Sequence, residues 1–303
     1  MYSHHFNQHC PDWATALLNG FSQIFLQRHP LCGLLCLLAI LFSAPSLLGG
    51  ALLGGVAGLL TAQRRGYAKA ERQAGLYSYN GVLLGLLLSQ QLAWSVLLWP
   101  LIIAAGGLSA IFTQQWFKRA RDPASLPTYT TPFVALAWLL LSLAEVQPAS
   151  SPSTLAISGP NLLAALFQGL GQIMLLERPL AGGLIVLGLF LASRRAAFWA
   201  LCGSAAGLAF GVLYHDAQGA LLGLTGYNPA LAALALSQVS RRPWWPLSGI
   251  TLAILLAPGF ASLGLPALTA PFILACWLAR ASARLFCPVK DKPATVAGLR
   301  IDR

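Results

Sequence analysis

The chain has 303 residues, of which 57% are hydrophobic and 9% are charged, and its mean hydropathy is +0.68. Ordinary soluble domains contain about 25% charged residues, so this composition excludes a soluble globular protein and indicates an integral membrane protein. The net charge of +11 does not indicate nucleic-acid binding, because the basic residues stand in short clusters between apolar runs.

Apolar runs long enough to cross a bilayer, at about 17 to 25 residues, follow one another along the chain, five in each half. We predict spanning helices at 30–47, 48–63, 75–91, 93–113 and 127–145, and at 179–193, 196–213, 220–238, 245–262 and 266–286. A shorter and more polar segment precedes each set, at 11–27 and 160–176. Each of these segments predicts a re-entrant half-helix.

Three short motifs occur twice in the same order, which indicates a duplicated chain. Gly20 to Phe25 returns at Gly169 to Met174, Gly75 to Asn80 at Gly223 to Asn228, and Leu126 to Phe133 at Leu265 to Phe272. We therefore predict a first repeat at 1–147, a Pro/Ser-rich linker at 148–159, a second repeat at 160–286 and a polar tail at 287–303. In so apolar a chain, a duplication is typical of a transporter or channel with its pathway at the repeat interface.

Basic residues predict the orientation of the two halves, because Lys and Arg in short loops favour the cytoplasmic side. They follow the second and fourth runs of the first half, and the first, third and fifth runs of the second half: Arg64, Arg65, Lys69, Arg72, Lys118, Arg119 and Arg121, then Arg194, Arg195, Arg241, Arg242, Arg284, Lys290 and Lys292. This pattern predicts an all-α, multi-pass protein of the cell inner or plasma membrane, with inverted repeats and both termini cytoplasmic.

Polar residues that recur at equivalent positions are candidates for a pathway through hydrocarbon, where unpaired polar groups are costly. They are Gln23 and Gln172 in the half-helices, and Thr130 and Thr269 before the last helix of each half. Each also has an ordinary structural interpretation, since Gln often joins helices and Thr often bonds a freed carbonyl.

Apolar walls for such a pathway are predicted at Tyr79 and Tyr227, with Leu83 and Leu231 four residues later on the same helical face. The alternative for these residues is core packing, with Asn80 and Asn228 as helix caps.

Charged groups at membrane depth are scarce, because the apolar runs contain no Asp, Lys or His. An ion-coupling carboxylate or proton relay is therefore hard to assemble, and we expect a neutral solute that moves uncoupled. No nucleophile–base set or metal cluster can be formed there either, so we expect no enzyme, no metal site and no cofactor.

The paired motifs resemble those of the urea transporters, from about residue 12 to residue 286. The resemblance rests on Gly-x-x-Gln-Ile with a following Pro-x-x-Gly at 30 and 179, Gly-Leu-x-x-Tyr-Asn at 75 and 223, and Leu-Pro-x-x-Thr-x-Pro-Phe at 126 and 265. It implies a homotrimer in the lipid bilayer, in which each protomer is a channel for urea between flat apolar side chains. One departure is Leu26, where many relatives carry Phe, with Leu175 opposite it, and this extends the expected solutes to small amides in general.

By the same resemblance, Gln23 and Gln172 are expected to contact urea near the two mouths, Thr130 and Thr269 to form the central constriction, and the Tyr and Leu pairs to line the slot. Two other functions stay open: an ion-coupled secondary transporter of a small neutral metabolite, and an ammonia channel. The second expects paired histidines in the pore, whereas His29 and His215 do not occupy equivalent positions.

Overall fold

The computed structural model describes residues 12–93, 95–120, 125–143 and 155–286, and every regular element in these ranges is a helix. The predicted N-terminal tail, linker residues 148–154 and the tail 287–303 lie outside the described residues. The all-helical class predicted from the sequence is confirmed for the described part of the chain.

The helices of the first half are α2 (Asp12–Gln23), α3 (Pro30–Ser43), α4 (Leu48–Arg64), α5 (Lys69–Gln73), α6 (Tyr79–Gln91), α7 (Leu98–Arg119) and α8 (Thr131–Leu143), with a 3₁₀ turn η1 (Pro45–Leu47). Those of the second half are α9 (Gly159–Gly171), α10 (Pro179–Ala192), α11 (Arg194–Phe210), α12 (Ala217–Leu221), α13 (Tyr227–Val239), α14 (Trp244–Ser262) and α15 (Ala270–Phe286). The shorter turns there are η2 (Gln172–Met174) and the π-helical η3 (Gly211–His215).

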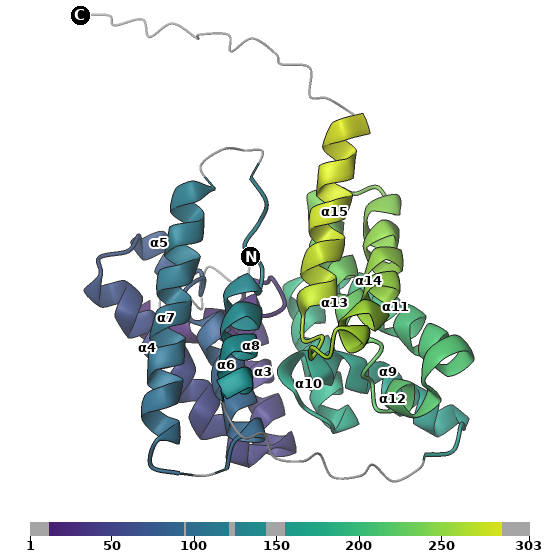
Figure 1. The fold of residues 1–303 in the computed structure, drawn as a ribbon, viewed down its shortest axis with the longest axis horizontal. Helices are drawn as coiled ribbons and strands as arrows, with labels where there is room; N and C mark the ends of the chain where they lie inside the picture. The colour runs from purple at the N-terminus through teal and green to yellow at the C-terminus, as the bar shows by residue number, and fades with distance from the viewer. Residues whose placement is uncertain (1–11, 94, 121–124, 144–154, 287–303) are drawn as a thin grey trace, which may run out of the picture.

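Each helix of the first half has a counterpart in the second half, in the same order. The paired helices α3 and α10 have 14 residues each, α4 and α11 have 17 each, and α6 and α13 have 13 each. In Figure 1 the helices of the first half, purple to teal, lie beside those of the second half, green to yellow.

Several helices are shorter than the runs that predicted them. Among the described residues, three helices are long and apolar enough to cross a membrane, Pro45–Arg64, Arg194–Tyr214 and Trp244–Ser262. A fourth candidate is the pair Gly159–Met174 and Pro179–Ala192, which is bent by 78°. The run 220–238 is broken because Gly223, at φ +79°, forms a turn between α12 and α13, as Gly75, at φ +77°, does before α6.

The helices α2 and α9 pack closely on α3 and α10, the helices that follow them in the chain. A Cβ atom on Gly33 would lie 1.8 Å from the carbonyl oxygen of Leu18, and a Cβ on Gly182 would lie 1.8 Å from that of Phe167. The glycine of each Pro-x-x-Gly motif therefore lets α3 touch the backbone of α2, and α10 that of α9.

The start of α2 is tied to α5 by polar contacts. Lys69 Nζ lies 2.6 Å from Asp12 Oδ2, and the Gln73 side chain donates to Asp12 Oδ1 at 2.8 Å. The hydrogen bond and the charge of Lys69 lower the pKa of the Asp12 carboxyl. These exposed contacts join the start of α2, the helix that ends at Gln23, to α5.

The equivalent helices α3 and α10 pack against each other in opposite directions. Arg178 Nη1, just before α10, donates to the carbonyl of Phe42 near the end of α3 at 3.4 Å. Gly188, late in α10, lies against Cys32 near the start of α3. Cys32 and Cys36 are free and fully buried there, and one contiguous apolar core runs through both halves.

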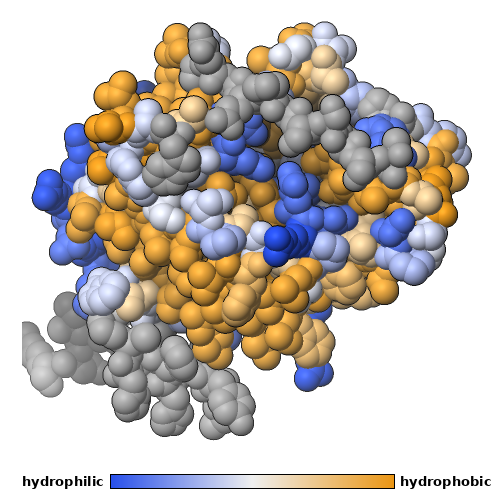
Figure 2. Space-filling view, turned by 90° about the horizontal axis from the view of Figure 1, so that it is seen from below, coloured by the Kyte–Doolittle hydropathy of each residue, from blue (hydrophilic) through white to orange (hydrophobic). Residues whose placement is uncertain are grey.

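Large apolar side chains cover much of the outer surface, and Figure 2 shows them over one face. Leu139, Phe198 and Leu255 are 53%, 59% and 65% exposed. Soluble monomers rarely expose contiguous apolar surface on this scale, so this surface suits contact with lipid.

Candidate functional site

Two threonine side chains from different halves meet in the interior of the molecule. Thr130 directly precedes α8 and Thr269 directly precedes α15, and both are buried. Their Oγ1 atoms lie 2.7 Å apart, within hydrogen-bond distance. The structure thus brings together the two threonines that the repeated motif singled out.

The residue before each threonine has a left-handed backbone, which is uncommon for residues other than glycine. Tyr129 has φ +43° and Leu268 has φ +44°. The carbonyl of Tyr129 accepts a hydrogen bond from the hydroxyl of Tyr79, and that of Leu268 accepts one from Asn228 Nδ2 at 2.9 Å. The Tyr-Asn motif of each half therefore holds the peptide before its threonine, through a different side chain in each half.

The two asparagines of these motifs have different roles. Asn228 Oδ1 also accepts the backbone N–H of Phe272 at 3.2 Å, so it caps α15 as the structural alternative expected. Asn80 instead donates to Thr113 Oγ1 at 3.5 Å, and its Oδ1 is buried without a hydrogen-bond partner among the described residues.

Two tryptophans hold the threonine loops in a reciprocal arrangement. Trp138 Nε1 in α8 donates to the carbonyl of Pro266 at 2.9 Å, and Trp277 Nε1 in α15 donates to the carbonyl of Pro127 at 2.9 Å. Each indole thus binds the loop of the other half. Sequence analysis missed this pair, although each tryptophan comes eight residues after its threonine, so the repeat offset marks both.

Aromatic side chains near the two threonines in the chain pack against each other. The rings of Tyr129 and Phe272 are 5.0 Å apart and meet edge to face. Leu83 and Leu231, each 1% exposed, belong to the core beneath them. Tyr79 is buried, whereas Tyr227 is half-buried.

The two glutamines that were predicted as partners differ in their surroundings. Gln23 Oε1 is buried and has no hydrogen-bond partner among the described residues. Gln172 Nε2 donates to the carbonyl of Leu222 at 3.1 Å. Of the two glutamines, only Gln23 therefore has a buried acceptor that the described part of the protein leaves unsatisfied, a state that costs roughly 1 to 3 kcal/mol.

Leu26, after α2, and Leu175, after α9 and η2, end these helical segments with the same backbone conformation. Both are left-handed, at φ +55° and +59°. Leu26 N–H donates to the Gln23 carbonyl at 2.9 Å and Gln27 N–H to that of Ser22 at 3.1 Å. The second half repeats both bonds, from Leu175 and Leu176 to Gln172 and Gly171. This is a Schellman ending in which leucine takes the position that glycine usually occupies.

Two cavities border the loops that carry the threonines, one cavity at each loop. A cavity of about 290 Å³ is lined by Gln23, Leu26, Arg28, Pro127, Tyr129, Ala235, Gln238, Val239 and Arg280, and we call it the basic mouth. A cavity of about 190 Å³ is lined by residues that include Asp216, Thr225, Tyr227, Asn228 and Ala267, and we call it the second mouth. Tyr129 is next to Thr130 and Ala267 is two residues from Thr269, so the loop of each threonine lines one of the two mouths.

The described residues contain no group of three or more His, Cys, Asp or Glu side chains placed to hold a metal ion. The threonines and their loops bond through hydroxyls, indole and amide N–H groups and backbone carbonyls, whereas charged side chains line the cavities, Arg28 and Arg280 in one and Asp216 in the other. The uncharged groups exchange hydrogen bonds with a neutral solute without a change of charge.

The chain is similar to known proteins over most of its length. A family model described as urea transporter matches residues 14–283. Urea transporter 1 of Ovis aries is 29% identical over 295 residues, which cover 88% of this chain and 75% of the relative. Urea transporter 1 of Mus musculus is 28% identical over 297 residues, with the same coverage.

Proposed function

The chain belongs to the urea transporter family, and on this premise we propose that it conducts urea down its gradient through a narrow, channel-like path. Members of this family are transporters and not enzymes, and the chain is accordingly a multi-pass membrane protein whose substrate is urea. The proposal adds the mechanism and the residues, and extends the solutes to other small amides.

The observation that carries the proposal is the buried contact between Thr130 and Thr269, whose loops each line one of the two mouths. Urea is planar and has four N–H donors and one strong acceptor. A hydroxyl can accept from an N–H and donate to a carbonyl. When urea enters, the bond between the hydroxyls is exchanged for bonds to the solute, and the net cost of such an exchange is small, about 1 kcal/mol.

Gln23 supports a contact site at the basic mouth. Its buried, unpartnered Oε1 gains an N–H donor when an amide solute arrives. We assign Gln172 the corresponding place on the other side, where its Oε1 can accept while its Nε2 stays bonded to Leu222. The remaining proposed contacts are the walls of the path, Tyr79, Leu83, Tyr227, Leu231, Leu26 and Leu175.

The two halves, residues 1–147 and 160–286, form an inverted repeat in this proposal. The opposite directions of the equivalent helices α3 and α10 support it. The 78° bend between Gly159–Met174 and α10 supports a re-entrant half-helix. We further propose that residues 148–159 link the halves and that 287–303 form a tail.

Contacts among the basic clusters support the proposed orientation. Arg195 Nη2 donates to the carbonyl of Ser240 at 2.5 Å, and Arg284 Nη2 donates to that of Ser125 at 3.5 Å. Basic loops of both halves therefore lie on one side, which we propose is cytoplasmic, together with both termini. The cell inner or plasma membrane and a homotrimeric assembly complete the proposal.

The test is a stopped-flow assay on proteoliposomes that compares urea, acetamide, ammonia and glycerol, with protein-free liposomes as the control. We expect fast urea entry, slower acetamide entry, and entry of ammonia and glycerol at the protein-free rate. Urea flux that stops when an ion gradient is dissipated would instead identify a coupled transporter. Accelerated ammonia entry without urea entry would identify an ammonia channel.

A further inference from the structure

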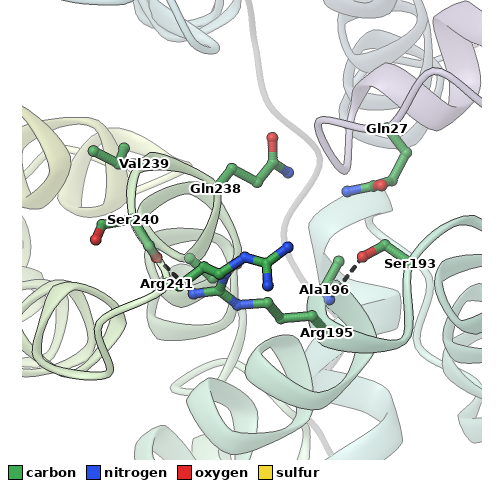
Figure 3. A pocket seen from close by; sticks show the side chains of 9 residues that line it. Gln27, Ser193, Arg195, Ala196, Gln238, Val239, Ser240 and Arg241 are labelled. Carbon is green, nitrogen blue, oxygen red and sulfur yellow. Dashed lines mark hydrogen bonds between the residues drawn. The ribbon is translucent and has the colours of Figure 1, made fainter.

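A second basic cavity lies beside the basic mouth. It has a volume of about 420 Å³ and is lined by Gln27, Ser193, Arg195, Ala196, Ser237, Gln238, Val239, Ser240 and Arg241. Figure 3 shows the side chains of Arg195 and Arg241 extending alongside each other in this cavity. We call it the arginine pocket.

In the sequence, the pairs Arg194-Arg195 and Arg241-Arg242 predict only the cytoplasmic side. In the structure, the two arginines of each pair have different surroundings. Arg194 lies over the ring of Phe190 at 5.2 Å, and Arg242 lies over the ring of Trp244 at 4.9 Å. Their neighbours Arg195 and Arg241 line the pocket instead. In each pair, one cation is placed on an aromatic face and the other faces the cavity.

The residues that line the pocket include no carboxylate. Two guanidinium groups therefore share one cavity that has no acidic lining residue, and their like charges repel each other. One N–H of Arg195 is engaged by the Ser240 carbonyl. The guanidinium has five N–H donors in a planar fork, so most of its donors stay available.

The other groups in the pocket also favour a negative ligand. Ser193 caps α11, where its Oγ accepts the backbone N–H of Ala196 at 3.3 Å. The pocket thus opens on the first turn of a 17-residue helix, the positive end of the helix dipole. Arginine forks bind the oxygens of a phosphate group in a bidentate way.

We propose that the arginine pocket binds a phosphate group, carried either by free phosphate or by the headgroup of an anionic lipid. The two guanidinium groups bind its oxygens and the start of α11 adds positive potential. The pocket shares Gln238 and Val239 with the basic mouth, and Gln238 Nε2 donates to the carbonyl of Leu26 at 3.3 Å. A bound phosphate group therefore lies beside the turn that follows Gln23.

The test measures binding directly on the purified full chain, without urea, so its outcome is separate from that of the transport proposal. Calorimetric titration with inorganic phosphate, against chloride at matched ionic strength, tests free phosphate. Native mass spectrometry of protein from nanodiscs with or without phosphatidylglycerol in phosphatidylcholine tests the lipid headgroup.

Four variants make the test specific. Arg195→Gln and Arg241→Gln remove the pocket cations, and Arg194→Gln and Arg242→Gln remove the same charge at adjacent positions outside the pocket. We expect the two pocket variants to weaken binding about tenfold or more, as loss of hydrogen bonds to a charged group does, and the two controls to bind as the wild type does. Arg241→Gln keeps the bond from Arg195 to Ser240, so it reports on binding even if Arg195→Gln fails to fold.

Saturable binding of inorganic phosphate that depends on the pocket arginines identifies free phosphate as the ligand. Retention of phosphatidylglycerol with the same dependence, without phosphate binding, identifies a lipid headgroup. The proposal is wrong if the wild type binds neither, or if binding falls equally in pocket and control variants.

Discussion

The hydroxyl oxygens of Thr130 and Thr269 lie 2.7 Å apart, although 139 positions separate them along the chain. The two groups occupy one place, at the end of two equivalent loops. On the proposed path, we expect a solute that passes between the mouths to contact both hydroxyls together.

Thr130→Val and Thr269→Val keep the shape of the side chain and remove its hydroxyl. Because both hydroxyls act on one solute, each change should slow urea flux by a similar factor. The double variant should be non-additive, with a coupling of about 0.5 kcal/mol or more. Stopped-flow urea flux per reconstituted protein measures all four forms of the cycle.

The control for this cycle is Thr251→Val, on the exposed side of α14, where the hydroxyl bonds its own helix at Leu247. It should conduct as the wild type does. If Thr130→Val and Thr269→Val have additive effects, or if only one of them slows urea flux, the threonines only stabilise their own loops.

Substitutions of the two glutamines should have different effects on urea flux and on thermal stability. Gln23→Leu removes a buried acceptor that has no partner in the described structure, so flux should fall about tenfold or more while the melting temperature is kept or raised. Gln172→Leu leaves the Leu222 carbonyl without its donor, so both flux and melting temperature should fall. Thermal unfolding and urea flux of the same samples give both values.

Gln90→Leu is the matched control, because Gln90 Oε1 is also buried without a partner in the described structure but lies at the end of α6, away from both mouths. It should leave flux unchanged. Unchanged flux in folded Gln23→Leu would remove Gln23 from the path.

The reciprocal tryptophans predict a paired loss of stability. Trp138→Phe and Trp277→Phe keep an aromatic ring and remove the N–H that binds Pro266 or Pro127. The bond to Pro127 is partly buried, so its loss should cost roughly 1 to 3 kcal/mol, and Trp277→Phe should unfold at a lower temperature and conduct urea more slowly. The bond to Pro266 is exposed, so Trp138→Phe should show smaller losses in the same direction. Trp199→Phe, whose ring packs on Phe198, is the control and should conduct normally. Normal stability of both loop variants would show that these bonds do not hold the loops.

The packing of α2 on α3 and of α9 on α10 predicts that neither Gly33 nor Gly182 can be replaced by a larger residue. Gly33→Ala and Gly182→Ala each place a Cβ 1.8 Å from a backbone oxygen, so the half-helix must move and the yield of folded protein should fall sharply. Gly183→Ala, next to Gly182, meets no atom within 4 Å and should fold normally. Size-exclusion chromatography of the detergent extracts compares the three. Full folding of Gly33→Ala would contradict the described contact.

Transport should be indifferent to pH between about 5.5 and 8, because Gln, Thr and Tyr side chains do not change charge in that range. It should also need no sodium or proton gradient. Urea flux into proteoliposomes, measured over this range with and without an ionophore, checks both expectations. A steep pH optimum would require a titrating group in the path.

The sequence predicted the order of the helices well, because apolar runs and paired motifs are local signals. It overestimated the lengths of α2 and α9, which end at Gln23 and Gly171 and not at 27 and 176. Leu26 and Leu175 take the left-handed conformation that ends them, and leucine carries no signal for such an ending. Likewise, the turn at Gly223 was read as part of one continuous run.

The threonine pair was predictable because the repeat marks equivalent residues, and the inverted repeat that we propose would bring such residues together. The bonds from Trp138 to Pro266 and from Trp277 to Pro127 were not, since an indole and a carbonyl 128 and 150 positions away have no local pattern that joins them. The division of each Arg-Arg pair between a ring and a pocket also depends on the fold alone.

The exchange of tryptophan bonds between the halves follows the contact rule of an isologous dimer, in which residue i of one copy binds residue j of the other and j binds i. A single half produced alone would expose both an indole N–H and a proline carbonyl, each shaped for a second copy. Two halves expressed as separate chains therefore retain the surfaces needed to reassemble.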